Sequence, residues 1–294
     1  MDEIKRIFLD TDIGPDCDDA AAVALSVIFC RQFGKKLIGV THCTSSPWGV
    51  GAINAILDWY GAKNIPVGTM SRKGFLDEEE NMTYNRELAL SVPAEKRIAP
   101  DAVQVMRKAL QDSPDGSVDI VGIGPFGNLA DLISDEEGRT LVQQKVRRLI
   151  IMAGDFAEGC DEPQWNIEMD IPAGRKVVDE WPGDVLFCGY EVGKDVIALA
   201  EPTGLKDDNP VRIAYLRYRK GQGRSSWDLC SVQYTVDENC PFYSLSEPGR
   251  VTLDDRAVSH FTPAEGGNHY LIKKIVPPDV IARFFEQTLL QAEP

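Results

Sequence analysis

The sequence predicts an α/β protein with an open, mostly parallel sheet that carries helices on both faces. Short apolar runs bounded by turn residues alternate with longer amphipathic stretches from residue 4 to about residue 193. This alternation is typical of parallel strands joined by crossover helices, which bury the strands on both sides. Because such crossovers are right-handed, the loops after the strands are expected along one sheet edge, where open α/β sheets bind ligands.

Each strand of this part is predicted from a compact apolar run that ends at a turn. The runs lie at residues 4–10, 36–43, 65–68, 117–124, 146–154 and 184–192. Helices are predicted between them at residues 18–33, 49–61, 99–111, 125–133 and 172–181. Beyond Lys194 the alternation weakens. A helix at 209–220, strand-like segments near 251–255 and 269–276, and a closing amphipathic helix at 280–292 are expected there.

The chain is expected to form one domain over residues 1–294. Its 43% hydrophobic content is enough for a sizeable core, and no repeat or Pro/Ser-rich linker divides the sequence. The acidic segment 71–97 has little apolar periodicity, so we expect it to form a flap over the site.

Composition argues against several classes of partner. Lys and Arg total 31 against 46 for Asp and Glu, and the net charge of −15 would repel both nucleic acid and an anionic membrane. The seven cysteines are scattered and form no CxxC pair, so neither a disulfide framework nor a zinc ribbon is expected. Since no apolar run resembles a signal peptide or a membrane span, we predict a cytoplasmic protein with reduced thiols.

Five aspartates follow the first predicted strand within ten positions: Asp10, Asp12, Asp16, Asp18 and Asp19. Helix capping and the helix dipole can account for an Asp at position 16 or 18. They do not account for Asp10 and Asp12, which precede the turn. Hard divalent cations prefer several carboxylate oxygens on a glycine-containing turn, so the cluster indicates a site for Ca²⁺ or Mg²⁺.

This turn resembles the N-terminal signature of the inosine-uridine-preferring nucleoside hydrolase family, a strand followed by Asp-x-Asp-Pro-Gly-x-Asp-Asp. Two extra residues separate Gly14 from the Asp pair, and Ile13 replaces the proline, so the turn must differ in shape. The resemblance implies that Asp12 binds Ca²⁺ and takes a proton from the attacking water. It also implies that Asp19 grips the metal with both oxygens and that Asp18 accepts a ribose hydroxyl.

Two later stretches are similar to the family's other metal-binding motifs. Residues 122–133, GIGPFGNLADLI, resemble its Gly-Pro-Leu-Thr-Asn-Leu-Ala turn, which implies that Gly127 offers a backbone carbonyl to Ca²⁺. Residues 225–236 resemble its His-Asp-Pro helix start, with Asp228 as the remaining carboxylate ligand. Trp227 replaces the histidine that protonates the leaving base. Because purine-preferring members carry Trp-Asp here and stack the base on the indole, the replacement implies a preference for purines.

A fourth stretch, residues 147–174, resembles the family segment that lines the sugar. Met152 and Asn166 match the sugar-lining Met and Asn of that segment. Cys160 stands where the family has a ribose-binding Asn, and Gln164 stands where it has a Glu that holds the outer hydroxyls. All four residues are therefore expected to contact substrate, with two of the contacts altered.

The function that this resemblance implies is Ca²⁺-dependent hydrolysis of the N-glycosidic bond of ribonucleosides, with a purine preference, by a homodimer or homotetramer. One alternative is a Mg²⁺-dependent phosphatase of the haloacid dehalogenase type, because Asp10 and Asp12 also form an Asp-x-Asp after the first strand. The Asp pair at positions 18 and 19 would have no role in such an enzyme. Another alternative, motivated by the two altered sugar contacts and the missing histidine, is a nucleoside- or sugar-binding protein without turnover.

Overall fold

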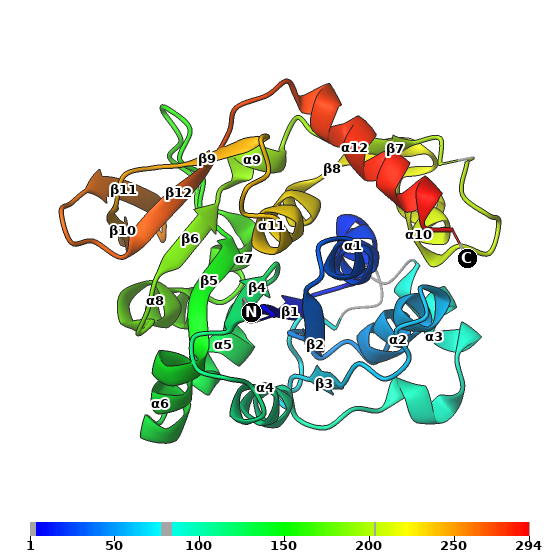
Figure 1. Ribbon diagram of the computed structural model, residues 1–294, viewed down its shortest axis with the longest axis horizontal. Helices are drawn as coiled ribbons and strands as arrows, with labels where there is room; N and C mark the ends of the chain where they lie inside the picture. The colour runs from blue at the N-terminus through cyan, green and yellow to red at the C-terminus, as the bar shows by residue number, and fades with distance from the viewer. Residues whose placement is uncertain (1–3, 78–83, 203, 294) are drawn as a thin grey trace.

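The computed structural model describes residues 4–77, 84–202 and 204–293, which build a central sheet between two layers of helices (Figure 1). The parallel strands are β1 (Arg6–Thr11), β2 (Lys36–His42), β3 (Val67–Thr69), β4 (Val118–Gly122), β5 (Val146–Met152), β6 (Val185–Cys188) and β12 (His269–Lys274). Antiparallel pairing adds β9 (Tyr243–Leu245), β10 (Gly249–Leu253) and β11 (Ser259–Pro263). The order is β11-β10-β12-β6-β5-β4-β1-β2-β3, with β9 on β12, which confirms the mostly parallel α/β sheet.

Each face of the sheet buries its own apolar core under helices. One core lies beneath α1 (Asp18–Gln32), α2 (Gly49–Trp59), α10 (Pro210–Arg219), α11 (Trp227–Val236) and α12 (Pro278–Gln291). The other lies beneath α4 (Ala102–Gln111), α5 (Gly127–Leu132), α6 (Glu136–Lys145) and α8 (Ile171–Glu180). The helix α1 is apolar on nearly every side and is enclosed by α2, α10, α11 and α12 (Figure 1), as expected for a buried helix.

Strand register brings distant parts of the sequence to one sheet edge. Asp10 of β1 pairs with Thr41 of β2 on one side and with Gly122 of β4 on the other. Gly122 in turn pairs with Ile151 of β5. The loops that follow β1, β4 and β5 therefore meet at the carboxyl edge, where the sequence predicts the functional site.

The predicted flap at 71–97 has several parts. Its middle, residues 78–83, lies outside the described residues. Leu76 borders the cavity described below, whereas α3 (Asn85–Ser91) and a short 3₁₀ helix at Ala94–Arg97 pack against α2. Tyr84 is fully buried, and its hydroxyl donates a hydrogen bond to the carbonyl of Asp16. The segment is thus anchored at Tyr84 to the aspartate-rich turn.

A small two-stranded antiparallel sheet that the sequence did not reveal lies beside the start of α11. It consists of β7 (Ile197–Ala200) and β8 (Gln222–Ser225), which pair with each other and not with the central sheet. The strand β8 leads directly into α11, whose first two residues are Trp227 and Asp228. The position of β8 therefore sets where Trp227 and Asp228 enter the site.

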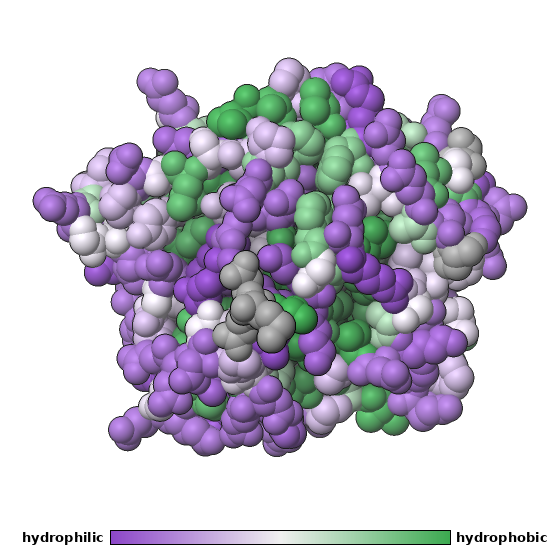
Figure 2. Space-filling view, in the orientation of Figure 1, coloured by the Kyte–Doolittle hydropathy of each residue, from purple (hydrophilic) through white to green (hydrophobic). Residues whose placement is uncertain are grey.

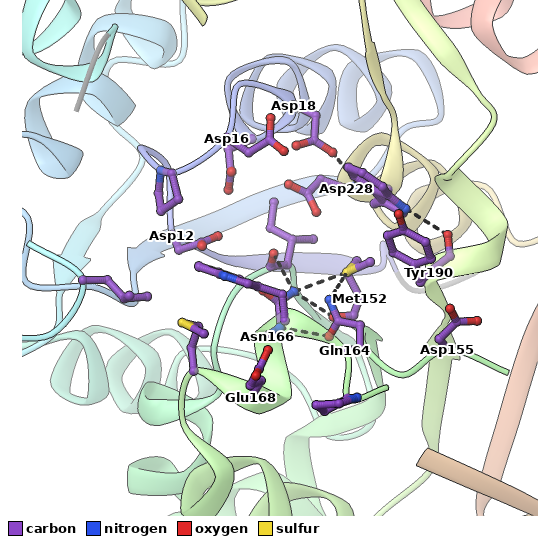
Figure 3. Close-up of a pocket in the computed structure, with 18 of the residues that line it drawn as sticks. Asp12, Asp16, Asp18, Met152, Asp155, Gln164, Asn166, Glu168, Tyr190 and Asp228 are labelled. Atoms are coloured by element: carbon purple, nitrogen blue, oxygen red, sulfur yellow. Dashed lines mark hydrogen bonds between the residues drawn. The ribbon is translucent and has the colours of Figure 1, made fainter. Parts of the chain in front are cut away.

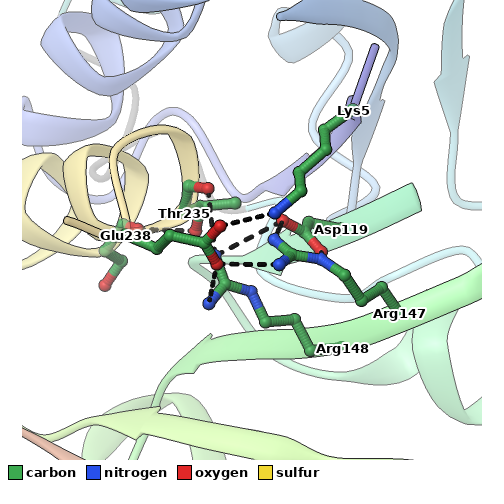
Figure 4. A network of polar contacts seen from close by, with 7 residues as sticks. Lys5, Asp119, Arg147, Arg148, Thr235 and Glu238 are labelled. Atoms are coloured by element: carbon green, nitrogen blue, oxygen red, sulfur yellow. Dashed lines mark hydrogen bonds and ion pairs between the residues drawn. The ribbon is translucent and has the colours of Figure 1, made fainter. Parts of the chain in front are cut away.

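The far end of α11 is held by a network of charged groups at the amino ends of β1, β4 and β5 (Figure 4). The Arg147 guanidinium donates to Asp119 at 2.8 Å and to Glu238 at 2.7 Å, and Arg148 and Lys5 also pair with Glu238. Although partial burial acts to raise the pKa of Glu238, hydrogen bonds from Lys5 and Arg147 lower it to about 2. The network fixes α11 against the strands that carry the site at their other end.

The surface is mainly polar. Figure 2 shows hydrophilic residues over most of the visible face, with hydrophobic residues in smaller groups between them. Within the described ranges, no helix is both long enough and apolar enough to cross a membrane.

Candidate active site

A cavity of about 650 Å³ opens at the carboxyl edge of β1, β4 and β5 (Figure 3). Its volume is in the range of small-molecule sites. All but one of the residues predicted to bind metal or substrate line it: Asp12, Asp18, Asp19, Met152, Cys160, Gln164, Asn166, Trp227 and Asp228. The exception is Gly127.

Three carboxylates form the centre of the site. Asp18 and Asp19 begin α1, and Asp228 is the second residue of α11, so two helix amino ends meet here. One oxygen from each of the three lies within 4.8 Å of the others, and the Asp228 amide donates to Asp18 Oδ2 at 3.2 Å. Burial and mutual repulsion raise the pKa of all three well above the usual range. A bound cation would offset this repulsion, so the donor set fits a metal.

Asp12 follows β1 and lies beside this group. Burial raises its pKa to about 7, although a hydrogen bond with Asp19 acts in the opposite direction. A Cβ added at Gly124 would lie 2.6 Å from Asp12 Oδ1 and 2.7 Å from Cys43 Sγ. Only glycine fits at that position, because any side chain would displace the Asp12 carboxylate.

Asp10 is separate from the cavity. Its Oδ1 accepts hydrogen bonds from Thr41 Oγ1 at 2.6 Å and from Asn128 Nδ2 at 2.8 Å. Its side chain is 1% exposed, and burial raises its pKa to about 7. The residue ties β2 and α5 to β1 beneath the site. Because Asp10 does not line the cavity, its position argues against a phosphatase that would use it as the nucleophile.

The structure places Gly127, the predicted carbonyl ligand, outside the cavity lining. Gly127 is the first residue of α5, where a Cβ would lie 2.6 Å from Met70 and 3.6 Å from Asp170, and it does not line the cavity. The carbonyl of the first residue of a helix points along the helix axis toward the next turn. Ile123, the residue directly after β4, lines the cavity, and its carbonyl accepts from Asn166 Nδ2 at 3.2 Å. Of these two residues, which lie four positions apart, only Ile123 lines the cavity.

Hydrogen bonds connect Met152, Gln164 and Asn166, three of the residues predicted to line the sugar. Asn166 Nδ2 also donates to the Met152 carbonyl at 2.9 Å, and the Asn166 amide donates to Gln164 Oε1 at 3.0 Å. Gln164 thereby caps the short helix α7 (Trp165–Glu168). Cys160 is half-buried at the rim, with its Sγ 3.7 Å from the Glu162 carbonyl. These hydrogen bonds hold the side-chain amides of Gln164 and Asn166 in place, whereas Cys160 lies at the rim of the cavity.

Trp227 belongs to an aromatic wall that the sequence showed only in part. Its Nε1 donates to the Tyr190 carbonyl at 2.9 Å, and the two rings stack with centroids 5.1 Å apart. Tyr190 begins α9 (Tyr190–Gly193), which follows β6, and Tyr218 of α10 also lines the cavity. Arg224 of β8 lies over the Trp227 ring at 4.8 Å. Neither tyrosine stands out in the sequence, and Arg224 is noticeable only because it precedes Trp227 in the Gly-rich segment.

Comparisons with known proteins agree with this geometry. A family model described as inosine-uridine preferring nucleoside hydrolase matches residues 7–256. An uncharacterized protein of Schizosaccharomyces pombe is 29% identical over 234 residues, which are 73% of this chain and 72% of the other. The structure of the plant nucleoside hydrolase PpNRh1 is similar with a TM-score of 0.72 at 19% identity, over 98% of this chain and 99% of that one.

An inosine-uridine preferring nucleoside hydrolase from Bacillus anthracis is similar with a TM-score of 0.70 at 15% identity, over 99% of both chains. At these identities the solved structures support the fold alone. The family model covers most of the chain, from β1 past α11, and so includes every residue of the cavity described above. The chain therefore belongs to the inosine-uridine preferring nucleoside hydrolase family and is a hydrolase that acts on N-glycosyl compounds.

Proposed function

We propose that this hydrolase uses Ca²⁺ to cleave the N-glycosidic bond of purine ribonucleosides, giving ribose and the free base. The observation that carries the proposal is the buried group of Asp18, Asp19 and Asp228 beside Asp12 in the cavity. Carboxylate oxygens on a flexible turn are the ligands that Ca²⁺ prefers, whereas softer metals prefer thiolates and imidazoles.

In this proposal the metal is held by Asp12, Asp19 and Asp228 together with the Ile123 carbonyl. When bound, the ion would supply positive charge that lowers the pKa of a water molecule and holds the sugar hydroxyls. Asp12 accepts the proton of the attacking water, for which a carboxylate with its pKa near the working pH is well suited.

The sugar lies between the metal site and the wall of Met152, Gln164 and Asn166. Asp18 accepts a hydrogen bond from a ribose hydroxyl, and Asn166 and Gln164 are held in place by their own hydrogen bonds before substrate arrives. Such preorganisation favours the oxocarbenium-like transition state, because the carboxylates around it need little rearrangement as positive charge develops on the sugar.

The purine preference rests on the aromatic wall. Tyr190 and Trp227 stack on each other and both line the cavity, so they form one rigid apolar surface. Stacking of a base on an aromatic side chain is worth about 1–3 kcal/mol in nucleic-acid systems. A purine offers this wall a larger face than a pyrimidine, so it gains more from the contact.

The test is release of reducing sugar from inosine, guanosine and uridine, with chelator and then with Ca²⁺ or Mg²⁺ restored. We expect ribose from the purine nucleosides, loss of the activity in chelator, and its recovery with Ca²⁺. No turnover of any nucleoside in Ca²⁺ would contradict the proposed substrate, and full activity in chelator would contradict the metal. Faster turnover of uridine than of inosine would contradict the purine preference.

The expected assembly and location are proposals of the same kind. A homodimer or homotetramer and a cytoplasmic location follow from the resemblance and from the composition. Light scattering on the purified protein checks the first, and imaging of a tagged chain in its own cell checks the second.

A further inference from the structure

The cavity is strongly acidic, which creates a difficulty for the departing base. Eight Asp or Glu residues line it, and Arg224 is the one Lys, Arg or His among its described lining residues. When the C1′–N bond breaks, its electron pair moves onto the base, which then carries developing negative charge. Surrounding carboxylates oppose that charge unless a cationic donor faces the base.

Arg224 is held in a fixed orientation at this place. Its Nε donates to Asp16 Oδ1 at 2.9 Å and Oδ2 at 2.7 Å, and its Nη2 also pairs with Asp16. The guanidinium carbon lies 4.8 Å from the ring centroid of Trp227 and 5.6 Å from that of Tyr218. Within the described part of the chain Nη1 makes no hydrogen bond, so its donors are free for a ligand.

The turn that holds Asp16 is itself constrained. The Cys17 amide donates to Asp16 Oδ1 at 2.6 Å, and the buried Tyr84 hydroxyl binds the Asp16 carbonyl. Arg224 and Asp16 are both about one-quarter exposed, with side-chain exposures of 25% and 21%. The ion pair therefore stands at the cavity wall, shielded on one side and open to a ligand on the other.

We infer that Arg224 is the electrophilic partner of the leaving base, donating hydrogen bonds through its free N–H groups to a base nitrogen or carbonyl oxygen. The inference rests on the proposed function. A guanidinium does not give up its proton at neutral pH, so Arg224 stabilises charge and does not act as an acid.

The electron and proton balance of the step is simple. The C1′–N bond breaks with its electron pair going to the base, which leaves as an anion bound to Arg224. The oxygen of water bonds to C1′, and its proton goes to Asp12. Solvent protonates the released base, and Asp12 returns its proton to solvent.

Substrates with different leaving groups test this role. Inosine needs help at the base, whereas p-nitrophenyl riboside leaves as a stable phenolate and needs little. We expect Arg224→Gln to lower kcat/KM for inosine by about 10²-fold, the usual cost of one lost charge-stabilising donor. The same change should lower kcat/KM for p-nitrophenyl riboside by less than about tenfold. Added guanidinium should restore part of the inosine rate, and Arg224→Lys should keep part of it.

Two further variants guard against a structural explanation. Asp16→Asn keeps Arg224 but weakens the contact that orients it. This variant should also lower kcat/KM more for inosine than for p-nitrophenyl riboside, by a smaller factor than Arg224→Gln. Arg139→Gln removes an exposed ion pair to Glu180, between α6 and α8. It should leave kcat/KM unchanged for both substrates. Circular dichroism and melting curves show whether each variant is folded.

Equal losses on both substrates, or no loss on inosine, would overturn the role of Arg224. A wild-type protein that cleaves neither substrate in Ca²⁺ would instead overturn the proposed function, so the two failures are distinguishable. A variant that fails to fold shifts the decision to Arg224→Lys and Asp16→Asn, in which a loss confined to inosine supports the role and equal losses refute it.

Discussion

Calcium should stabilise this protein against heat, and more so at pH 7.5 than at pH 5.5. The reason is the buried carboxylate group. Burial raises the pKa of Asp12 from 3.8 to about 7, and burial and repulsion raise those of Asp18, Asp19 and Asp228 as well. A carboxyl whose folded pKa exceeds its unfolded value favours folding below the unfolded pKa, near 3.8. That contribution is lost as the pH rises through about 7.

The shift at Asp12 spans about three pKa units, and each unit corresponds to about 1.4 kcal/mol for an isolated group. The metal-free protein is therefore destabilised near neutral pH by an amount on the order of a few kcal/mol, which a cation can offset. An ion at a hundred times its Kd adds about 2.7 kcal/mol. In a large domain of roughly 150–250 residues or more, a gain of about 2.7 kcal/mol corresponds to an increase in Tm of roughly 5–10 °C.

The assay is a thermal melt with 1 mM Ca²⁺ (about a hundred times a Kd of about 10 µM) or with chelator, at both pH values. Asp19→Asn should remove most of the calcium effect. Asp10→Asn is the matched control, because Asp10 is equally buried but does not line the cavity. A Tm that calcium leaves unchanged at pH 7.5, or raises equally at both pH values, would refute the reasoning.

Four other changes have definite expected outcomes. Asp12→Asn should lower kcat by at least ~10²-fold at saturating Ca²⁺ in steady-state assays, because the amide cannot accept the water proton. Gly124→Ala should abolish turnover in the same assay and cost ~1–3 kcal/mol in urea melts, since its Cβ would lie 2.6 Å from Asp12 Oδ1. Trp227→Ala should lower kcat/KM for inosine by about ten- to a hundredfold and for uridine much less. Glu238→Gln should cost about 1–2 kcal/mol at pH 7 in urea melts, after allowance for solvent screening. That difference should vanish as the pH falls from 4.5 toward about 2, because the pKa of Glu238 is lowered in the folded state.

The sheet and most of its helices could be predicted because their signals are local. Apolar periodicity and turn residues mark β1 to β6 and the helices α1, α2, α4, α5 and α8, and these observed elements fall within a few residues of the predicted ones. The helices α3, α6 and α7 lie between the same strands but were not predicted. The part after Lys194 was harder to predict, because β7 and β8 are short and are separated in the sequence by α10. Gly221 and Gly223, both at positive φ, also interrupt the apolar pattern at β8.

The clustered carboxylates of the cavity could also be anticipated, but the backbone carbonyl beside them could not be placed. The residue type alone shows that Asp19 and Asp228 offer carboxylates. Every residue has a backbone carbonyl, so which carbonyl faces the cavity depends on where β4 ends and α5 begins. The strand ends at Gly122, which leaves the carbonyl of Ile123 at the cavity and places that of Gly127 inside the helix. Gly127, the predicted ligand, lies four residues beyond Ile123 and therefore falls outside the cavity.

The two extra residues in the aspartate-rich turn bear on the role inferred above for Arg224. They lengthen the path between Gly14 and Asp18, and Asp16 in that longer path reaches the Arg224 guanidinium. Since 208 positions separate these two residues, neither motif alone indicates the pair. With Arg224 held over Trp227, the cavity has a cation beside its aromatic wall. In the mechanism inferred above, this cation stabilises the departing base, so the base needs no proton from the protein. The longer turn contributes to that mechanism because it carries Asp16, which orients the guanidinium.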